Sequence, residues 1–212
     1  MPCNNCNSFG LSFDRAYEPQ QAIAGSRNSR IWIIGLNPAQ DQDWIDQRQI
    51  NDLINYFGNQ ATVHRYFKRF RIVSETLYNQ FGADHGVAHT DLVKCFSPTW
   101  PPEGVTAQGR SQIIANCTSH LQGQLREFSP EIIICNGSEV SAEVKRLLPP
   151  SPNTSSQATT YTYEDGERSI QIVLSGFIGR IDNYSKRRLG VEIEALISAL
   201  PGQNIIADAG VA

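Results

Sequence analysis

Asn37 is the first residue of the chain whose position points to chemistry. It follows the apolar run Ile31–Leu36 and is held between Gly35 and Pro38. An apolar run of this length is too short to cross a membrane and predicts a buried strand that ends in a loop. In an open α/β sheet the residues just past the carboxyl end of a strand line the ligand crevice, so Asn37 is a candidate catalytic residue. The alternative is a helix cap, a position that asparagine favours.

Four cysteines are grouped as in a metal site. Cys3 and Cys6 form a Cys-x2-Cys pair, and Cys95 and Cys117 follow after a long gap. Structural disulfides are disfavoured in a cytosolic chain, so this grouping indicates a metal ion or a cluster rather than bridges. The fifth cysteine, Cys135, lies within an apolar run and is expected to be an inert buried thiol.

Two groups of positive charge could meet a polyanion. In the first, aromatic and basic side chains alternate around Tyr66 and Phe67, which could stack on a base while the cations meet phosphate. The second comprises Arg180, Lys186, Arg187 and Arg188. Either group could instead be a solvated helix face. The net charge of −3 argues against a nonspecific polyanion binder, because such domains usually carry a basic excess.

The apolar pattern predicts the elements that would position these candidates. Strands are expected at 31–36, 86–93, 131–135 and 169–174, helices at 44–57, 63–78, 106–128, 137–148 and 185–200, and an exposed loop at 151–162. Strands that alternate with helices, without an internal repeat, predict a parallel sheet covered on both faces. We therefore expect a three-layer α/β/α sandwich around a central, mostly parallel four-stranded sheet.

Length and composition fit one domain. The chain has 212 residues, of which 40% are hydrophobic and 18% are charged, as in ordinary globular proteins. We expect a single domain over residues 1–200, in which residues 1–30 form a cluster-binding segment, followed by a tail at 201–212. No signal peptide or membrane span is recognisable, which predicts a cytoplasmic protein. No protein partner is indicated, and we expect a monomer.

Residues 35–39, Gly-Leu-Asn-Pro-Ala, resemble the first motif of the uracil-DNA glycosylase superfamily, in which a Gly-x-x-Pro-like turn follows the first strand. Asn37 stands at the third place, where several branches carry Asp or Asn. By this resemblance Asn37 would hold the attacking water, with assistance from Asp41. The alternative for Asp41 is a charge at the start of a helix. The resemblance runs from Cys3 to the last helix and implies the glycosylase fold.

The cysteines extend the resemblance to one part of that superfamily. In its iron-sulfur branches four cysteines ligate a [4Fe-4S] cluster, and the third of them follows a lysine, as Cys95 follows Lys94 here. The resemblance therefore implies a [4Fe-4S] cluster on Cys3, Cys6, Cys95 and Cys117. Zinc bound by four thiolates is the alternative.

The second strand departs from the family's pattern at Asp91. The family shows an asparagine there, which reads uracil through one donor and one acceptor. A protonated Asp91 would instead donate toward N3 of cytosine and accept from its 4-amino group, and burial favours the protonated form of a carboxyl group. The alternative is a structural residue that caps a loop or binds Lys94.

Two further departures suggest an altered base. Ala39 and Gln40 replace the bulky aromatic with which uracil enzymes exclude 5-substituted pyrimidines, and Ser175 stands where the family's later motif, His-Pro-Ser, begins. Phe177 and Ile178 could form the wedge that fills the gap left by a flipped base, with core packing as the alternative. The expected base-recognition residues are Asp91, Leu36, Ala39, Tyr66, Phe67 and Ser175, and the expected DNA-binding residues are Phe177, Ile178, Arg180, Lys186 and Arg187.

The function expected from these features is that of a monofunctional DNA glycosylase acting on a 5-modified cytosine. Ordinary cytosine must be spared, so hypermodified cytosines of phage DNA fit best, which suggests antiviral defence as the role. One alternative is a conventional repair glycosylase for uracil or mismatched thymine. Another is a non-catalytic module that binds DNA or a damaged base. A nucleotide-binding domain is disfavoured because residues 35–38 lack the glycine spacing and lysine of a phosphate loop.

Overall fold

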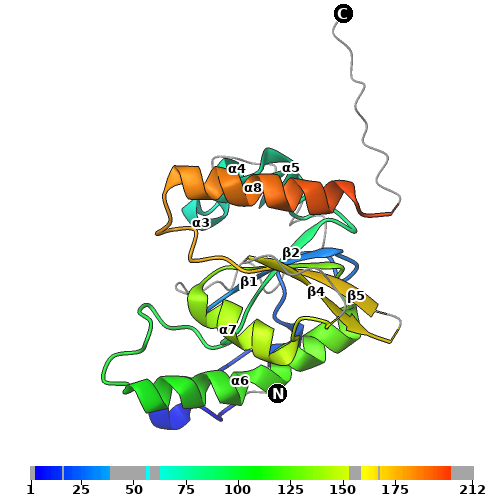
Figure 1. Cartoon of the computed structure of the whole chain (residues 1–212). Coiled ribbons are helices and arrows are strands. Elements are labelled where there is room, and N and C mark those ends of the chain that lie inside the picture. The colour runs from blue at the N-terminus through cyan, green and yellow to red at the C-terminus, as the bar shows by residue number, and fades with distance from the viewer. Residues whose placement is uncertain are drawn as a thin grey trace, which may run out of the picture.

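The computed structural model describes residues 3–15, 17–38, 56–57, 63–152, 159–166 and 168–201. A five-stranded sheet lies between two layers of helices (Figure 1). The strands are β1 (Ile31–Gly35), β2 (Val87–Asp91), β3 (Ile132–Cys135), β4 (Thr160–Asp165) and β5 (Arg168–Val173). The helices are α3 (Arg65–Lys68), α4 (Phe70–Val73), α5 (Glu75–Tyr78) and α8 (Asn183–Ser198) on one face, and α6 (Ala107–Phe128) and α7 (Ser138–Leu147) on the other.

The strand order is β2-β1-β3-β5-β4, so β1 lies next to β2 and β3. These pairs and the β3–β5 pair are parallel, and only β4 is antiparallel to its neighbour. In register, Gly35 is opposite Asp91 on one side, and Ile34 is opposite Cys135 on the other. The carboxyl ends of β1, β2 and β3 therefore meet at one edge of the sheet.

The predicted three-layer α/β/α sandwich is confirmed, but the predicted number of four strands is wrong. The additional strand is β4, whose first residues fall in the segment 151–162 that was expected to be a loop. Its side chains are mostly polar and only Tyr161 is buried, because β4 lies at the edge of the sheet. Pairing with β5 provides the backbone hydrogen bonds that a lone polar segment lacks, and its register places Tyr161 opposite Ile172.

β1 shows why the apolar runs become central strands. Ile31 and Ile33 pack with the helical layer of α3, α4, α5 and α8. Trp32 and Ile34 point to the opposite face and pack in the cluster that covers α6 and α7. Successive side chains of a strand point to opposite faces, so a strand buried on both sides must be apolar throughout.

The helices predicted at 106–128, 137–148 and 185–200 are confirmed as α6, α7 and α8. The helix predicted at 63–78 is three short helices, α3 to α5. Its continuity is lost at Ser74, whose extended backbone ends α4 and whose hydroxyl accepts a hydrogen bond from Leu77 N to cap α5. Most of the helix predicted at 44–57 lies outside the described residues.

The segment before β1 covers the outer edge of β2. Ala24 and His89 exchange two backbone hydrogen bonds of 2.8 Å, which pair the edge strand with this segment. Two short 3-10 helices, η1 (Asn7–Phe9) and η2 (Pro19–Gln21), precede this contact. The beginning of the segment packs in a small apolar cluster with α6 and with Val93, just after β2.

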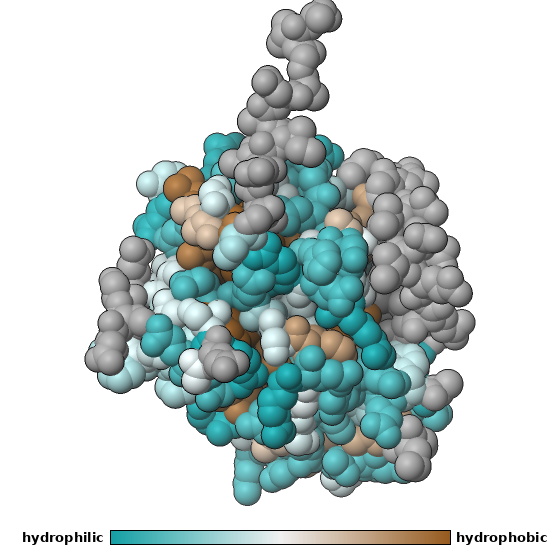
Figure 2. All heavy atoms as spheres, turned by 90° about the vertical axis from the view of Figure 1, so that its right-hand side faces the viewer, coloured by the Kyte–Doolittle hydropathy of each residue, from teal (hydrophilic) through white to brown (hydrophobic). Residues whose placement is uncertain are grey.

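Among the coloured residues of the face seen in Figure 2, hydrophilic ones predominate, and hydrophobic residues form small patches between them. Among the residues that the structure describes, no helix combines the length and the apolar character needed to span a bilayer.

Candidate active site

A cleft of ≈ 980 Å³ opens at the carboxyl ends of β1, β2 and β3. Its lining includes seven of the residues predicted from the sequence, which are Leu36, Asn37, Tyr66, Phe67, Asp91, Phe177 and Arg180. They come from segments far apart in the chain. The parallel order of the three strands brings their ends together, as expected for a ligand site in an open α/β sheet.

Asn37 is held by the turn that follows β1. Backbone hydrogen bonds join this turn to the segment after β2, including one of 3.0 Å from Ser97 N to Pro38 O. The amide Nδ2 of Asn37 donates to the carbonyl oxygens of Pro38 and Ser97, at 3.0 Å each. Both partners are acceptors, so the amide nitrogen must face them, and Oδ1 is left as an acceptor. The predicted alternative of a helix cap involves the N–H groups of residues 39 and 40, which lie outside the described residues.

Asp91 is the last residue of β2 and lies beside the turn of Asn37. A Cβ on Gly35 would overlap Asp91 Oδ1 and would lie 3.0 Å from His89 Nε2. Glycine at position 35 therefore lets two polar side chains of β2 sit directly against β1. Residues 89 and 91 are two apart on a strand and share one face, which is the face toward the cleft.

Lys94 lies in the bend after β2 and makes three hydrogen bonds there. Its Nζ donates to Thr90 Oγ1 and Gln124 Oε1, both at 2.7 Å, and to the main-chain oxygen of Asp91. Burial lowers the pKa of Lys94 to about 8, and the negative charge of Asp91 acts in the opposite direction. The lysine thus fixes the backbone between Asp91 and Cys95.

A hydrogen-bonded chain of three side chains forms one wall of the cleft. Ile178 N donates to Asn136 Oδ1 at 2.8 Å, Asn136 Nδ2 donates to Tyr66 Oη at 2.7 Å, and Tyr66 Oη lies 2.9 Å from His89 Nε2. Burial, with a smaller effect of the Lys94 charge, lowers the pKa of His89 to about 3. Burial also raises the pKa of Tyr66, with the charge of Asp91 adding to the effect. Both groups are therefore neutral at physiological pH.

An aromatic wall adjoins this chain. The rings of Tyr66 and Phe177 are nearly parallel, at 16°, with centroids 6.4 Å apart. Phe177 is 39% exposed, whereas Phe67 is buried and lies edge-on to His89 with centroids 5.4 Å apart. A flat, partly exposed ring beside polar groups is suited to stacking on a base.

Sequence reasoning missed His89 and Asn136. His89 was read as part of an apolar strand, yet it alternates with Asp91 and so shares its face. Asn136 follows the apolar run of β3 just as Asn37 follows that of β1. The strand-end rule that selected Asn37 would have found Asn136 as well.

Other predicted residues lie away from the cleft lining. Ser175 Oγ donates to the oxygen of Gly176 at 2.6 Å and is not part of the lining. Ile178 is 1% exposed and its side chain packs in the core, which matches the core alternative. Lys186 is 8% exposed, whereas Arg187 is exposed on α8. The predicted site residues Ala39 and Asp41 lie outside the described residues.

Three of the four predicted metal-ligating cysteines, Cys6, Cys95 and Cys117, contact one another next to the bend that contains Lys94. Hydrogen bonds from Cys117 and Cys95 lower the pKa of the Cys6 thiol to about 3. Contacts with Cys117 and Cys6 raise the pKa of Cys95, and the contact with Cys6 raises the pKa of Cys117 to about 11. The three thiols lie in one apolar cluster, and Cys3 packs against it. Cys3 Sγ lies 3.7 Å from His120 Nε2.

Cys6, Cys95 and Cys117 are close together but are not arranged around one point as ligands of a single ion. Among the described residues, no three or more His, Cys, Asp and Glu side chains are arranged to hold one metal ion. Cys135 is fully buried in the apolar cluster of α6 and α7, where burial raises the pKa of its thiol.

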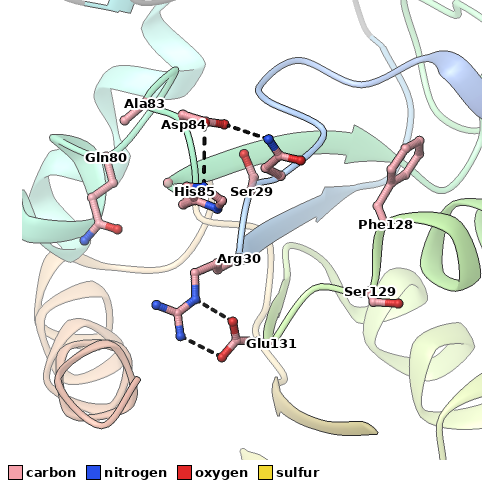
Figure 3. Close-up of a pocket in the computed structure, with 11 residues that line it drawn as sticks. Ser29, Arg30, Gln80, Ala83, Asp84, His85, Phe128, Ser129 and Glu131 are labelled. Carbon is pink, nitrogen blue, oxygen red and sulfur yellow. Dashed lines mark hydrogen bonds and ion pairs between the residues drawn. The ribbon is translucent and has the colours of Figure 1, made fainter. Parts of the chain in front are cut away.

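A second hollow of ≈ 760 Å³ lies at the opposite, amino ends of β1, β2 and β3 (Figure 3). Its central feature is the ion pair of Arg30 with Glu131, in which Arg30 Nη2 donates to Glu131 Oε2 at 2.8 Å. Asp84 lies nearby and accepts hydrogen bonds from Ser26 and Asn28. These charges are satisfied within the protein, and the strand-end rule favours the first cleft as the active site.

The family model described as the uracil DNA glycosylase superfamily matches residues 23–176, well over half of the chain. The matched segment includes Asn37, Asp91, Cys95 and Cys117, whereas Cys3 and Cys6 precede it. No curated protein matches the chain.

Proposed function

Because the chain belongs to the uracil DNA glycosylase superfamily, whose members are DNA glycosylases, we propose that it is a monofunctional glycosylase acting on a modified pyrimidine. The enzyme would flip the base out of DNA and hydrolyse its N-glycosidic bond to leave an abasic site. The favoured substrate is a 5-modified cytosine. The observation that carries this proposal is that Asn37 and Asp91 line one cleft at neighbouring strand ends.

Asn37 would position the attacking water. Its Nδ2 is engaged by Ser97 and Pro38, so Oδ1 remains to accept a hydrogen bond from water in a fixed orientation. An amide cannot ionise near neutral pH, so Asn37 orients the water and does not deprotonate it. The water oxygen bonds to C1′ of the sugar as the bond from C1′ to the base breaks, and the base leaves with that electron pair. The proton that the added water then loses passes to solvent water.

Asp91 would read the base and assist its departure. Cytosine offers N3 as an acceptor and its 4-amino group as a donor. The carboxylate of Asp91 would take up a proton when the base enters the cleft and would then offer the complementary donor and acceptor. A proton given by Asp91 toward N3 neutralises the negative charge that develops on the departing base. The cleft of ≈ 980 Å³ has room for a substituent beyond the pyrimidine ring.

The absence of a free amine at the Asp91 bend supports hydrolysis rather than covalent catalysis. Lys94 is the lysine next to Asp91 in the strand-end turn, and its amine already makes three hydrogen bonds in a buried position. A bifunctional glycosylase needs an amine that can attack the sugar. We therefore expect abasic sites without strand cleavage. Arg180, exposed at the rim of the cleft, would contact a phosphate.

The role that fits a 5-modified cytosine best is defence against phage DNA. An enzyme that released ordinary cytosine would destroy the host genome, so recognition must depend on a bulky 5-substituent. Hypermodified phage cytosines provide such a substituent.

Base release from matched DNA duplexes tests the proposal. The duplexes contain uracil, thymine opposite guanine, cytosine, or 5-modified cytosines that include glucosylated hydroxymethylcytosine, and alkaline cleavage reveals abasic sites. We expect release from a modified cytosine and none from cytosine. Release from uracil or mismatched thymine alone would contradict the substrate and indicate conventional repair. No release from any duplex, with DNA binding retained, would indicate a non-catalytic binding module.

We also propose that Cys3, Cys6, Cys95 and Cys117 hold a [4Fe-4S] cluster, with zinc as the alternative. The convergence of the Cys6, Cys95 and Cys117 thiols in one cluster supports a thiolate-bound centre. Such a centre would join the segment before β1 to the bend after β2 and to α6, so its contribution would be to stability. Catalysis would remain with the cleft residues.

Replacing Cys117 with alanine is expected to remove the metal and to lower the melting temperature. The wild-type protein should contain about four iron and four sulfide per chain. Cys135→Ala is the matched control, because this buried thiol lies in another cluster and should keep the full iron content. A wild-type protein with about one zinc per chain and no sulfide would show that the four cysteines bind zinc and not a cluster. A metal-free, stable wild-type protein would contradict both.

A further inference from the structure

The family's later motif begins with a histidine that this chain lacks at Ser175, yet a different histidine lies in the cleft. His89 comes from β2, two residues before Asp91, and it lines the same cleft as Asn37. We propose that His89 is a catalytic residue that donates a hydrogen bond from Nδ1 to the oxygen of the departing base. This inference rests on the proposed glycosylase function and names a further residue for it.

The hydrogen-bonded chain fixes which nitrogen of His89 carries the proton. A backbone N–H, that of Ile178, can only donate, so Asn136 must turn Oδ1 toward it. Asn136 Nδ2 then donates to Tyr66 Oη, which sends the hydroxyl hydrogen of Tyr66 to His89 Nε2. A neutral imidazole whose Nε2 accepts must carry its hydrogen on Nδ1.

The Nδ1 atom is placed to meet a ligand. Within the part of the chain that the structure describes, His89 Nδ1 has no hydrogen-bond partner, and it does not belong to the polar atoms that are buried without one. The residue is 8% exposed and lines the cleft. An incoming base oxygen can therefore fill the vacant hydrogen-bond position.

The order of polar groups along a cytosine matches the order of residues along β2. The 4-amino group, N3 and O2 follow one another on the pairing edge of the base. If Asp91 meets the 4-amino group and N3, the next polar atom along the edge is O2, and the next side chain on the same face of β2 is His89. Negative charge develops on O2 as the bond to the sugar breaks.

The neutral state of His89 suits this role. Burial and the charge of Lys94 hold the pKa of His89 at about 3, so the imidazole stays uncharged across physiological pH. A neutral imidazole can donate to a developing oxyanion without itself losing a proton. Two other polar side chains lie near His89. Tyr66 is hydrogen-bonded to its Nε2, and Asp91 lies beside it against Gly35.

Two isosteric substitutions separate a catalytic role from a structural one. In His89→Gln the side-chain amide reaches the place of Nε2, which keeps the contact with Tyr66 but removes the donor at Nδ1. In His89→Asn the shorter amide keeps a donor at the place of Nδ1 and loses the contact with Tyr66. We expect His89→Gln to slow base release about 100-fold or more and His89→Asn to slow it less than about tenfold, at equal thermal stability. The reverse order would show that His89 only positions Tyr66 and would overturn the proposal.

A binding measurement separates failure of this inference from failure of the proposed function. DNA that carries the target nucleotide with a 2′-fluoro sugar resists hydrolysis, and its binding should shift the Nδ1 signal of His89 in ¹⁵N NMR spectra. If the wild-type protein releases no base, the proposed function fails, and the shift still decides whether His89 meets the base. If the wild-type protein is active but the signal does not move, the inference about His89 fails alone.

Discussion

Replacing Asn37 with alanine is expected to slow base release by at least about 100-fold, while affinity for DNA changes by less than about twofold. The physical reason is loss of an oriented acceptor. Asn37 Oδ1 is directed by two hydrogen bonds from Nδ2 to carbonyl oxygens, so a water bound to it is held in one place. Alanine leaves that water without an anchor. Single-turnover release from the modified-cytosine duplex, together with DNA binding by fluorescence anisotropy, measures both quantities.

The matched control is Val191→Ala, because Val191 is 69% exposed on α8 and does not line the cleft. This variant should keep the wild-type rate and affinity. A variant Asn37→Ala that still releases the base at the wild-type rate would refute the role of Asn37 in positioning water. Equal losses of rate and affinity would instead assign Asn37 to DNA binding.

Replacing Asp91 with asparagine is expected to reverse the base preference. Release of the modified cytosine should fall by about 10³-fold or more, because an amide cannot give a proton to N3 and would leave buried polar groups mispaired. Uracil release should appear, since the amide donor and acceptor match O4 and the N3 proton of uracil. The same set of duplexes measures both changes.

Asp91→Ala separates base reading from a structural role. This variant keeps the hydrogen bond between Lys94 and the main-chain oxygen of residue 91, because the backbone is unchanged. If Asp91 reads the base, both activities should be low in Asp91→Ala while the melting temperature stays near that of the wild type. Loss of folding in Asp91→Ala, or unchanged cytosine release in Asp91→Asn, would show that the carboxylate is structural.

The layered fold could be predicted because the central strands are apolar on both faces. β1 is unbroken from Ile31 to Ile34, and its neighbour β3 is an equally short apolar run, whereas β2 begins with apolar residues and ends with polar ones. β4 could not be predicted in the same way, because an edge strand buries few side chains and Tyr161 alone carries the pattern. Its hydrogen bonds depend on β5, and that partner cannot be recognised from the local sequence.

The candidate site was predictable where a polar residue ends an apolar strand. Asn37 and Asp91 both have this position, and the structure places both in the cleft. The hydrogen-bonded chain through Asn136 and Tyr66 was not predictable, because it joins β3 to α3 and depends on how those elements pack. The burial of Ile178 was not decidable either, since an apolar residue next to Phe177 fits a wedge and a core equally well.

The parallel arrangement of β1, β2 and β3 has a consequence for how such a protein can evolve. Asn37, Asp91 and Asn136 each end or follow a different strand, and the strands themselves are held by apolar packing that does not involve these side chains. A mutation at one strand end therefore leaves the other two in place. In the proposed glycosylase, the group that reads the base could therefore be exchanged in a single step while the water site is inherited intact.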